Sequence, residues 1–246
     1  MTGLTPLYPV SHKTVFVLDH GPYFALPCQQ VEYDVGRRTG PGFIPLTPIT
    51  KTVWTSAVEA VAEYCRIVWD IFPRGDRLIR VVVGGSDTPG GRGDEVGWGE
   101  AEQNMSSMLD VVAGVGSPSC DTRDSGVVAG VRRGMELLCQ LSPRQLGVSD
   151  GQLLVNRGRI VVVTTLKSDA KYQQLVAAVE QQLALVNKEA AAAGDRGVQP
   201  LAELEVTVLH TQPSSAGDIG LRTEQDVVSS RQGSPFCSVL KPTLKG

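Results

Sequence analysis

Four short apolar runs along the chain predict β-strands. Three of them read TVFVL, LIRVVV and IVVVTTL, and they are nearly continuous in β-branched and other apolar residues. Such runs are typical of strands that are covered on both faces, as in a parallel sheet. We therefore predict strands at residues 14–18, 78–83, 160–166 and 204–209.

Helical spacing separates these runs. Apolar residues three and four positions apart predict helices over residues 55–72, 101–114 and 126–138. The longest predicted helix covers 169–193, where Ser168 or Asp169 can accept from the free N–H groups and Gly194 can form the C-terminal turn. Strands that alternate with such helices build βαβ units. The predicted fold class is therefore α/β, with a three-layer, doubly wound, mostly parallel sheet.

The segments around this alternating pattern divide the chain further. Residues 21–54 hold two candidate strands, VEYDV and FIPLTPI, around the turn GRRTGPG, which predicts a hairpin inserted after the first strand. We expect residues 1–10 to be a flexible N-terminus and 11–213 to form one domain. Residues 214–246 turn to Ser, Gly and Gln without a periodic pattern, which predicts a disordered tail.

Composition limits the function classes. The 246 residues are 41% apolar and 20% charged, which is typical of a soluble globular protein. A net charge of −3 gives no general reason to expect nucleic-acid binding. The basic clusters at 37–38, 132–133 and 157–159 would make RNA contact worth testing if two of them share a face. Five cysteines without a CxxC pair favour a reducing cytosol or nucleus, and no apolar run reaches the roughly 18 residues of a membrane span.

Polar residues follow the predicted strands, where open α/β sheets bind ligands. They are Asp19, His20, Ser86, Asp87, Thr165, Lys167, Ser168, Asp169 and His210. Asp19, Ser86, Asp87 and Asp169 could together hold Mg²⁺, which would give a metal-dependent ligand-binding or phosphoryl-handling domain. In the simpler interpretation Asp19 bonds the neighbouring loop and Asp169 starts a helix. A metal site needs hydroxyl residues at a set spacing, and these are missing here, which favours this second interpretation.

Other catalytic and cofactor motifs are incomplete. The histidines form no HxxxH or Cys/His pair, so zinc is not expected. The stretch GGSDT lacks the last glycine of a G-x-S-x-G nucleophile turn, and TPGGRGDEVGWG has no phosphate-binding lysine. We therefore expect no catalytic residue and no cofactor.

Longer words of the sequence resemble one family. SHKTVFVLDHGPYF, GFIPLTPITKTVWTSAVE, EYCRIVWDIFP and NRGRIVVVTTLKSD resemble, in this order, the Asunder proteins, which form the thirteenth subunit of the Integrator complex. The resemblance extends from about residue 11 to about residue 213. Members of that family are considerably longer than this chain. The resemblance therefore implies that the chain matches only their N-terminal domain. That domain has the von Willebrand factor A fold, which agrees with the predicted layers.

The resemblance also implies a degenerate metal-ion-dependent adhesion site. That site reads D-x-S-x-S after the first strand, and the matching positions here are Asp19, Gly21 and Tyr23. The aspartate that follows the late central strand is absent too, since Thr164-Thr165-Leu166 stands there. We therefore expect no bound metal and a surface that works by protein contact. Tyr23 and Trp54, with other exposed apolar residues of the 21–54 excursion, are the candidate contacts.

Function and partners follow from the same resemblance as expectations. It implies a non-catalytic subunit that pairs with the fourteenth and tenth Integrator subunits, in a module proposed to bind nucleic acids such as RNA. It further implies roles in small nuclear RNA 3'-end processing, transcription regulation, mitosis and dynein recruitment at the nuclear envelope. The expected location is the nucleus and the cytoplasm, in part perinuclear.

Overall fold

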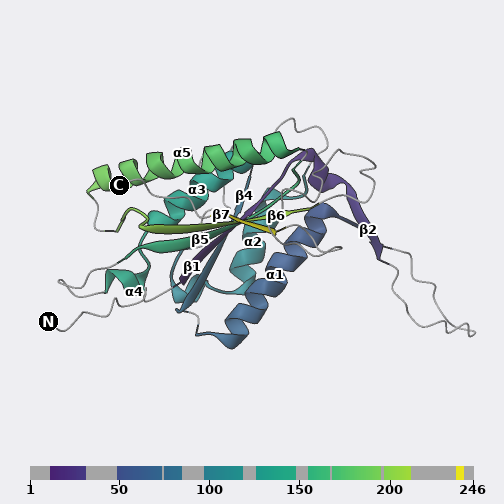
Figure 1. Cartoon of the computed structure of the whole chain (residues 1–246). Helices are drawn as coiled ribbons and strands as arrows, with labels where there is room; N and C mark the ends of the chain where they lie inside the picture. The colour runs from purple at the N-terminus through teal and green to yellow at the C-terminus, as the bar shows by residue number, and fades with distance from the viewer. Residues whose placement is uncertain are drawn as a thin grey trace, which may run out of the picture.

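A parallel sheet lies at the centre of the molecule (Figure 1). The computed structural model describes residues 12–31, 49–73, 75–84, 97–118, 126–147, 155–166, 168–194, 197–211 and 237–240. Among these residues one sheet has the order β4-β1-β5-β6-β7, and a hairpin pairs β2 with β3. The four parallel strands are β1 (His12–Leu18), β4 (Arg77–Val83), β5 (Arg157–Thr164) and β6 (Glu203–His210). All four predicted strands are thus confirmed, each within a few residues of its expected ends.

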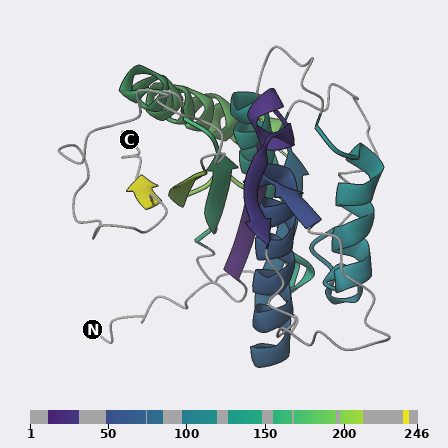
Figure 2. The same ribbon diagram turned by 90° about the vertical axis from the view of Figure 1, so that its right-hand side faces the viewer.

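Helices cover both faces of this sheet (Figures 1 and 2). The helices α1 (Val53–Ile71) and α2 (Met105–Val115) pack on one face, together with a cluster that includes Phe16, Val81 and Val161. On the other face lie α3 (Val127–Cys139) and α5 (Asp169–Ala193). Short turns complete the set: η1 (Pro22–Ala25), η3 (Glu100–Glu102) and α4 (Pro143–Leu146). The predicted three-layer α/β class is therefore confirmed.

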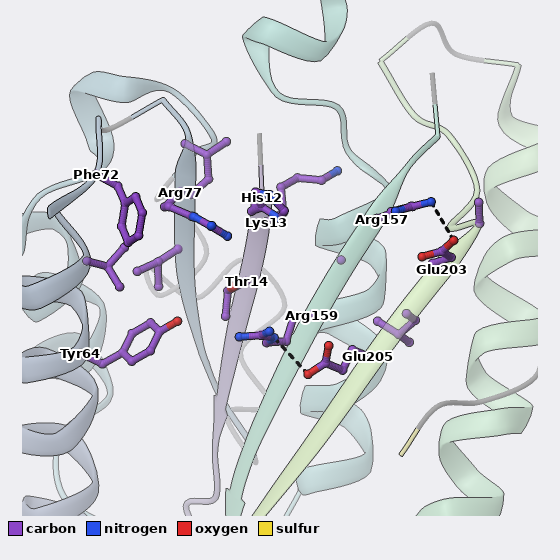
Figure 3. A pocket seen from close by; sticks show the side chains of 16 residues that line it. His12, Lys13, Thr14, Tyr64, Phe72, Arg77, Arg157, Arg159, Glu203 and Glu205 are labelled. Carbon is purple, nitrogen blue, oxygen red and sulfur yellow. Dashed lines mark ion pairs between the residues drawn. The ribbon is translucent and has the colours of Figure 1, made fainter. Parts of the chain in front are cut away.

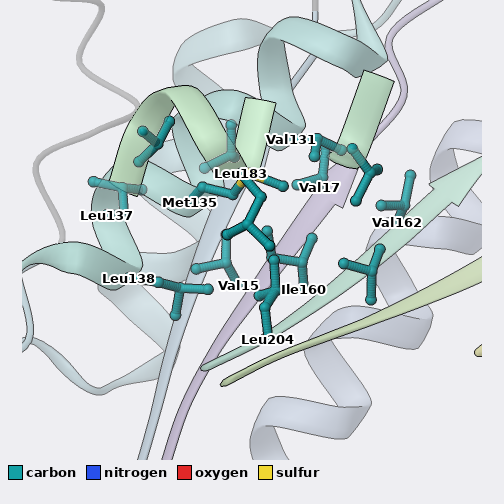
Figure 4. Close-up of a cluster of buried hydrophobic side chains, with 14 of the residues drawn as sticks. Val15, Val17, Val131, Met135, Leu137, Leu138, Ile160, Val162, Leu183 and Leu204 are labelled. Carbon is teal, nitrogen blue, oxygen red and sulfur yellow. The ribbon is translucent and has the colours of Figure 1, made fainter. Parts of the chain in front are cut away.

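The α3 layer approaches the sheet closely because of two glycines. A Cβ atom at Gly130 would lie 2.8 Å from Cγ1 of Val17, and one at Gly134 would lie 3.3 Å from Cδ1 of Ile160. Figure 4 shows Val17 and Ile160 beneath this helix, within the larger apolar cluster. Small residues therefore let the helix backbone settle against the β-branched surface of β1 and β5.

The helix ends agree with the local signals in the sequence. The Oγ1 atom of Thr52 accepts from the N–H of Thr55 at 3.1 Å and begins α1, which ends just before Pro73. Ser168 caps α5 in the same way, and Gly194 ends it in a left-handed conformation with φ of 60°. These caps satisfy N–H groups that no helical carbonyl can reach.

The inserted hairpin is confirmed, and each of its described strands overlaps the expected segment by one residue. β2 (Pro27–Val31) and β3 (Ile49–Thr52) are antiparallel, while the candidate strands VEYDV and FIPLTPI fall almost wholly outside the described residues. The stretch expected to be a disordered tail contains β7 (Cys237–Leu240), which pairs antiparallel with β6. This strand was missed because four residues are too short to show a period.

A buried lysine closes the C-terminal end of α3. The Lys13 side chain is 2% exposed, and its Nζ donates to the carbonyl oxygens of Leu138 at 2.6 Å and Gln140 at 2.8 Å. The indole N–H of Trp98 donates to the Leu137 carbonyl at 3.0 Å. Burial lowers the pKa of Lys13 to about 7. Carbonyls that the helix leaves without an internal partner are thus satisfied by side chains from elsewhere in the fold. No helix among the described residues is long and apolar enough to cross a bilayer.

Candidate functional site

Asp19 lies at the carboxyl end of β1, where the sequence predicts a ligand site. It is 3% exposed, and its Oδ1 accepts from the N–H of Gly21 at 2.8 Å. Its Oδ2 accepts from Oγ1 of Thr164 at 2.6 Å. Burial raises the pKa of the Asp19 carboxyl, while these hydrogen bonds act in the opposite direction. Asp19 therefore joins the ends of β1 and β5 and shapes the turn after β1.

The residues around Asp19 do not fit a divalent cation. Gly21 offers no side-chain oxygen, and Thr164 directs its hydroxyl hydrogen at the Asp19 carboxylate. Within the described part of the chain, no group of three His, Cys, Asp or Glu side chains is placed to hold a metal ion. Ser86 and Asp87, the other members of the predicted magnesium set, lie outside the described residues. A metal prefers several convergent hard oxygens, and the residues of this corner that the structure describes do not supply them.

The other polar residues of this edge have local contacts. The Nδ1 atom of His210 accepts from the N–H of Leu166 at 3.0 Å and ties the β5 exit to β6. Ser168 caps α5, and Asp169 is its first residue, as the simpler interpretation expected. The Nε2 atom of His20 lies 3.2 Å from the carbonyl oxygen of Gly116. Lys167 lies outside the described residues.

The two aromatic residues predicted as partner contacts differ in accessibility. Trp54 is 6% exposed, and its ring packs edge-to-face against His20 with 5.1 Å between ring centroids. In this structure Trp54 is therefore a core residue and not a surface anchor. The prediction failed because an aromatic at the start of an amphipathic helix gives no local sign of which face it joins. Tyr23, in η1, is half-buried, and its role as a contact stays a prediction.

A groove at the opposite edge of the sheet was not predicted. It has a volume of about 760 Å³ and lies between the C-terminal half of α1 and the N-terminal ends of the four parallel strands. One wall comes from Tyr64 and Val68 of α1 and from Phe72, the residue that follows the helix. Figure 3 shows Tyr64 and Phe72 on this side of the groove. The floor comes from alternate strand residues, among them Arg77 and Arg159.

Phe72 shows why sequence reasoning missed this groove. Its spacing placed it on the buried stripe of α1, but its side chain is 39% exposed. The helix runs past the apolar part of the sheet and ends beside charged strand residues. A usable signal was present, since residues 64, 67 and 71 are apolar as well, and at helical spacing they widen the stripe beyond the face that the core covers.

The two basic clusters that the structure describes do not share a face. Arg132 and Arg133 lie on α3, where both pair with Glu136 at 3.0 and 3.2 Å. The pair at 157 and 159 lies on β5 at the groove, across the sheet from α3. Residues 37–38 lie outside the described part of the chain. The condition set for an extended RNA-binding face is therefore not met by the described clusters.

Comparison with known families decides the affiliation of the chain. The family model for the cell cycle and development regulator Mat89Bb matches residues 8–229. The chain belongs to the Mat89Bb family. This match covers the whole sheet except β7, so both the Asp19 corner and the groove lie within the family's domain.

Curated relatives of this Mat89Bb chain carry two names. Integrator complex subunit 13 of Homo sapiens is 35% identical over 246 residues, which cover 95% of this chain and 32% of that protein. Integrator complex subunit 13 of Mus musculus is 36% identical over 84% of this chain and 29% of its own length. Protein asunder of Drosophila willistoni is 33% identical, with coverages of 69% and 26%. The chain thus spans about a third or less of the length of these relatives, and the resemblance to Asunder is confirmed.

Proposed function

We propose that this Mat89Bb chain is a non-catalytic protein-interaction domain of an Integrator complex subunit. The observation that carries the proposal is the 35% identity to Integrator complex subunit 13 of Homo sapiens across 95% of the chain. The Asp19 corner supports the non-catalytic part. Its carboxylate is buried and accepts hydrogen bonds from Gly21 and Thr164. It therefore holds the strand ends together and does not act as a reacting group.

The partners belong to the same proposal. We infer that the domain pairs with the fourteenth and tenth Integrator subunits, and that RNA is reached through the assembled module. A single chain with a net charge of −3 supports this indirect route to RNA. The roles that follow are small nuclear RNA 3'-end processing and transcription regulation in the nucleus. Mitotic progression and dynein recruitment add a cytoplasmic, perinuclear location.

Co-purification tests the proposal. The full chain and the fourteenth subunit are expressed together and passed through size exclusion with light scattering, and the same is done with the tenth subunit. We expect a complex heavier than either chain alone with at least one of them. Separate peaks with both subunits would show that this part of the family does not pair by itself, and the proposed interaction role would be wrong.

A further inference from the structure

The floor of the groove is an ordered array of charged side chains. In the register of the sheet, His12 stands beside Arg77, and Thr14 stands between Ile79 and Arg159. The side chains of alternate residues point to the same face, so these rows face α1. One strand further along, Arg157 pairs with Glu203 at 2.9 Å, and Arg159 pairs with Glu205 at 3.3 Å, as Figure 3 shows.

Positive charge exceeds negative charge on this floor. Three arginines, Arg77, Arg157 and Arg159, line the groove against the two carboxylates of Glu203 and Glu205. Both carboxylates are already paired with arginines. The guanidinium of Arg77 instead lies 4.8 Å from the ring centroid of Phe72, and no described carboxylate forms an ion pair with it. Partial desolvation lowers the pKa of His12, and so do the three neighbouring arginines, which reports the positive field.

The wall of the groove continues into an exposed apolar stripe. Four exposed large hydrophobic side chains occupy the last nine residues up to the end of α1, at helical spacing: Tyr64, Ile67, Ile71 and Phe72, with exposed fractions of 38, 42, 65 and 39%. Tyr64 is anchored, because its ring packs edge-to-face on Phe16 at 5.1 Å. Apolar side chains gathered in this way beside a charged groove mark an interaction site.

We propose that this groove binds an acidic segment of a partner protein that carries aliphatic or aromatic anchors. The anchors pack on the α1 stripe, and the carboxylates pair with the positive charge of Arg77, which no described carboxylate neutralises. A nucleic acid fits less well, since the two most exposed side chains of the stripe, Ile71 and Ile67, are aliphatic and cannot stack bases. This inference rests on the proposed interaction function and names the chemistry of the partner.

Selection from random peptides tests the inference, because it asks the groove itself which chemistry it binds. A phage library of random peptides is selected on the full chain and counter-selected on Ile71→Glu, whose parent side chain is 65% exposed, so the variant is expected to fold. Enriched peptides are expected to have net negative charge and at least one large apolar residue. Enrichment of neutral or basic peptides, or no enrichment over Ile71→Glu, would overturn the proposal.

Affinity measurements on the most enriched peptide locate the site. By fluorescence anisotropy we expect Arg77→Glu and Ile71→Glu each to weaken binding about tenfold. The matched control is Leu185→Glu on α5, across the sheet, where the parent residue is 38% exposed. It is expected to leave the affinity within about twofold. Equal affinity for wild type, Arg77→Glu and Ile71→Glu would overturn the assignment.

Two further measurements separate the other occupants. An oligouridine RNA that binds with comparable affinity and responds to Arg77→Glu but not to Ile71→Glu would identify a polyanion surface and overturn the proposal. A dimer of the chain that Ile71→Glu dissociates would identify a second copy as the occupant, with the same consequence. If Integrator pairing survives Arg77→Glu and Ile71→Glu, the proposed function stands and the groove is not the pairing surface. If the acidic peptide binds the groove but the chain pairs with neither Integrator subunit, the groove inference stands and the proposed function is wrong.

Discussion

The buried amine of Lys13 makes the stability of this chain depend on pH in a measurable way. Burial lowers the pKa of Lys13 to about 7 from its ordinary value of 10.5. Between these two values the unfolded chain holds a proton on this amine and the folded chain does not. The free energy of unfolding therefore rises with pH across this interval. Below about pH 7 the buried amine is protonated in the folded chain too, and its full destabilising effect is present.

The size of the effect follows from the same pKa. A difference of one bound proton changes the free energy of unfolding by about 1.4 kcal/mol per pH unit. Because half of the folded molecules are protonated near pH 7, the expected gain from about pH 7 to about pH 8.5 is roughly 1.6 kcal/mol. Burial raises the pKa of Cys65 to about 12 and that of Cys139 to about 11, so both thiols favour unfolding at higher pH. The measurement is best kept below the pKa of an unfolded thiol, about 8.5 to 9.

Urea unfolding followed by tryptophan fluorescence is a suitable assay. The ring centroid of Trp98, one of three tryptophans, lies 5.8 Å from the Lys13 Nζ, so part of the signal reports this region. Lys13→Met keeps much of the volume and removes the titrating amine, and we expect it to lose the rise with pH. Lys188→Met, at an exposed position on α5, is the matched control and should keep it.

Two results would refute this reasoning. Wild-type stability that is flat or falls over the interval would show that the folded amine keeps its ordinary pKa, held charged by the carbonyls of Leu138 and Gln140. A rise that persists in Lys13→Met would assign the pH dependence to another group.

Three further predictions concern packing and the Asp19 corner. Gly130→Ala would place a methyl group 2.8 Å from Cγ1 of Val17, so we expect a loss of about 1–3 kcal/mol in thermal or urea unfolding. Gly114→Ala, with nothing within 4 Å, is the matched control and should be neutral or stabilising. Thr164→Val removes the 2.6 Å hydrogen bond to a buried carboxylate and should cost about 1–3 kcal/mol near neutral pH; an unchanged urea midpoint would contradict this. Millimolar Mg²⁺ should leave the melting temperature of the wild-type chain unchanged, and a rise that Asp19→Ala abolishes would restore the metal hypothesis.

Local signals in the sequence determined most of the elements. The helix predicted at 169–193 has these same bounds in α5, because Ser168 and Gly194 act on backbone groups within one turn. The strand runs of β1, β4 and β5 were equally readable, since burial on both faces demands apolar residues at successive positions. The family words gave the affiliation, which needs no geometry.

Only the tertiary structure decided the surface and the inner contacts. The Asp19–Thr164 hydrogen bond joins residues 145 positions apart, and Lys13 reaches α3 across 125 positions. The sheet order β4-β1-β5-β6 brings Arg77, His12 and Arg159 to one face, and the length of α1 carries Phe72 beyond the apolar core. Periodicity records which side of an element is apolar, but not which element lies opposite. Partners across the sheet are therefore decided by strand order, which short-range patterns do not contain.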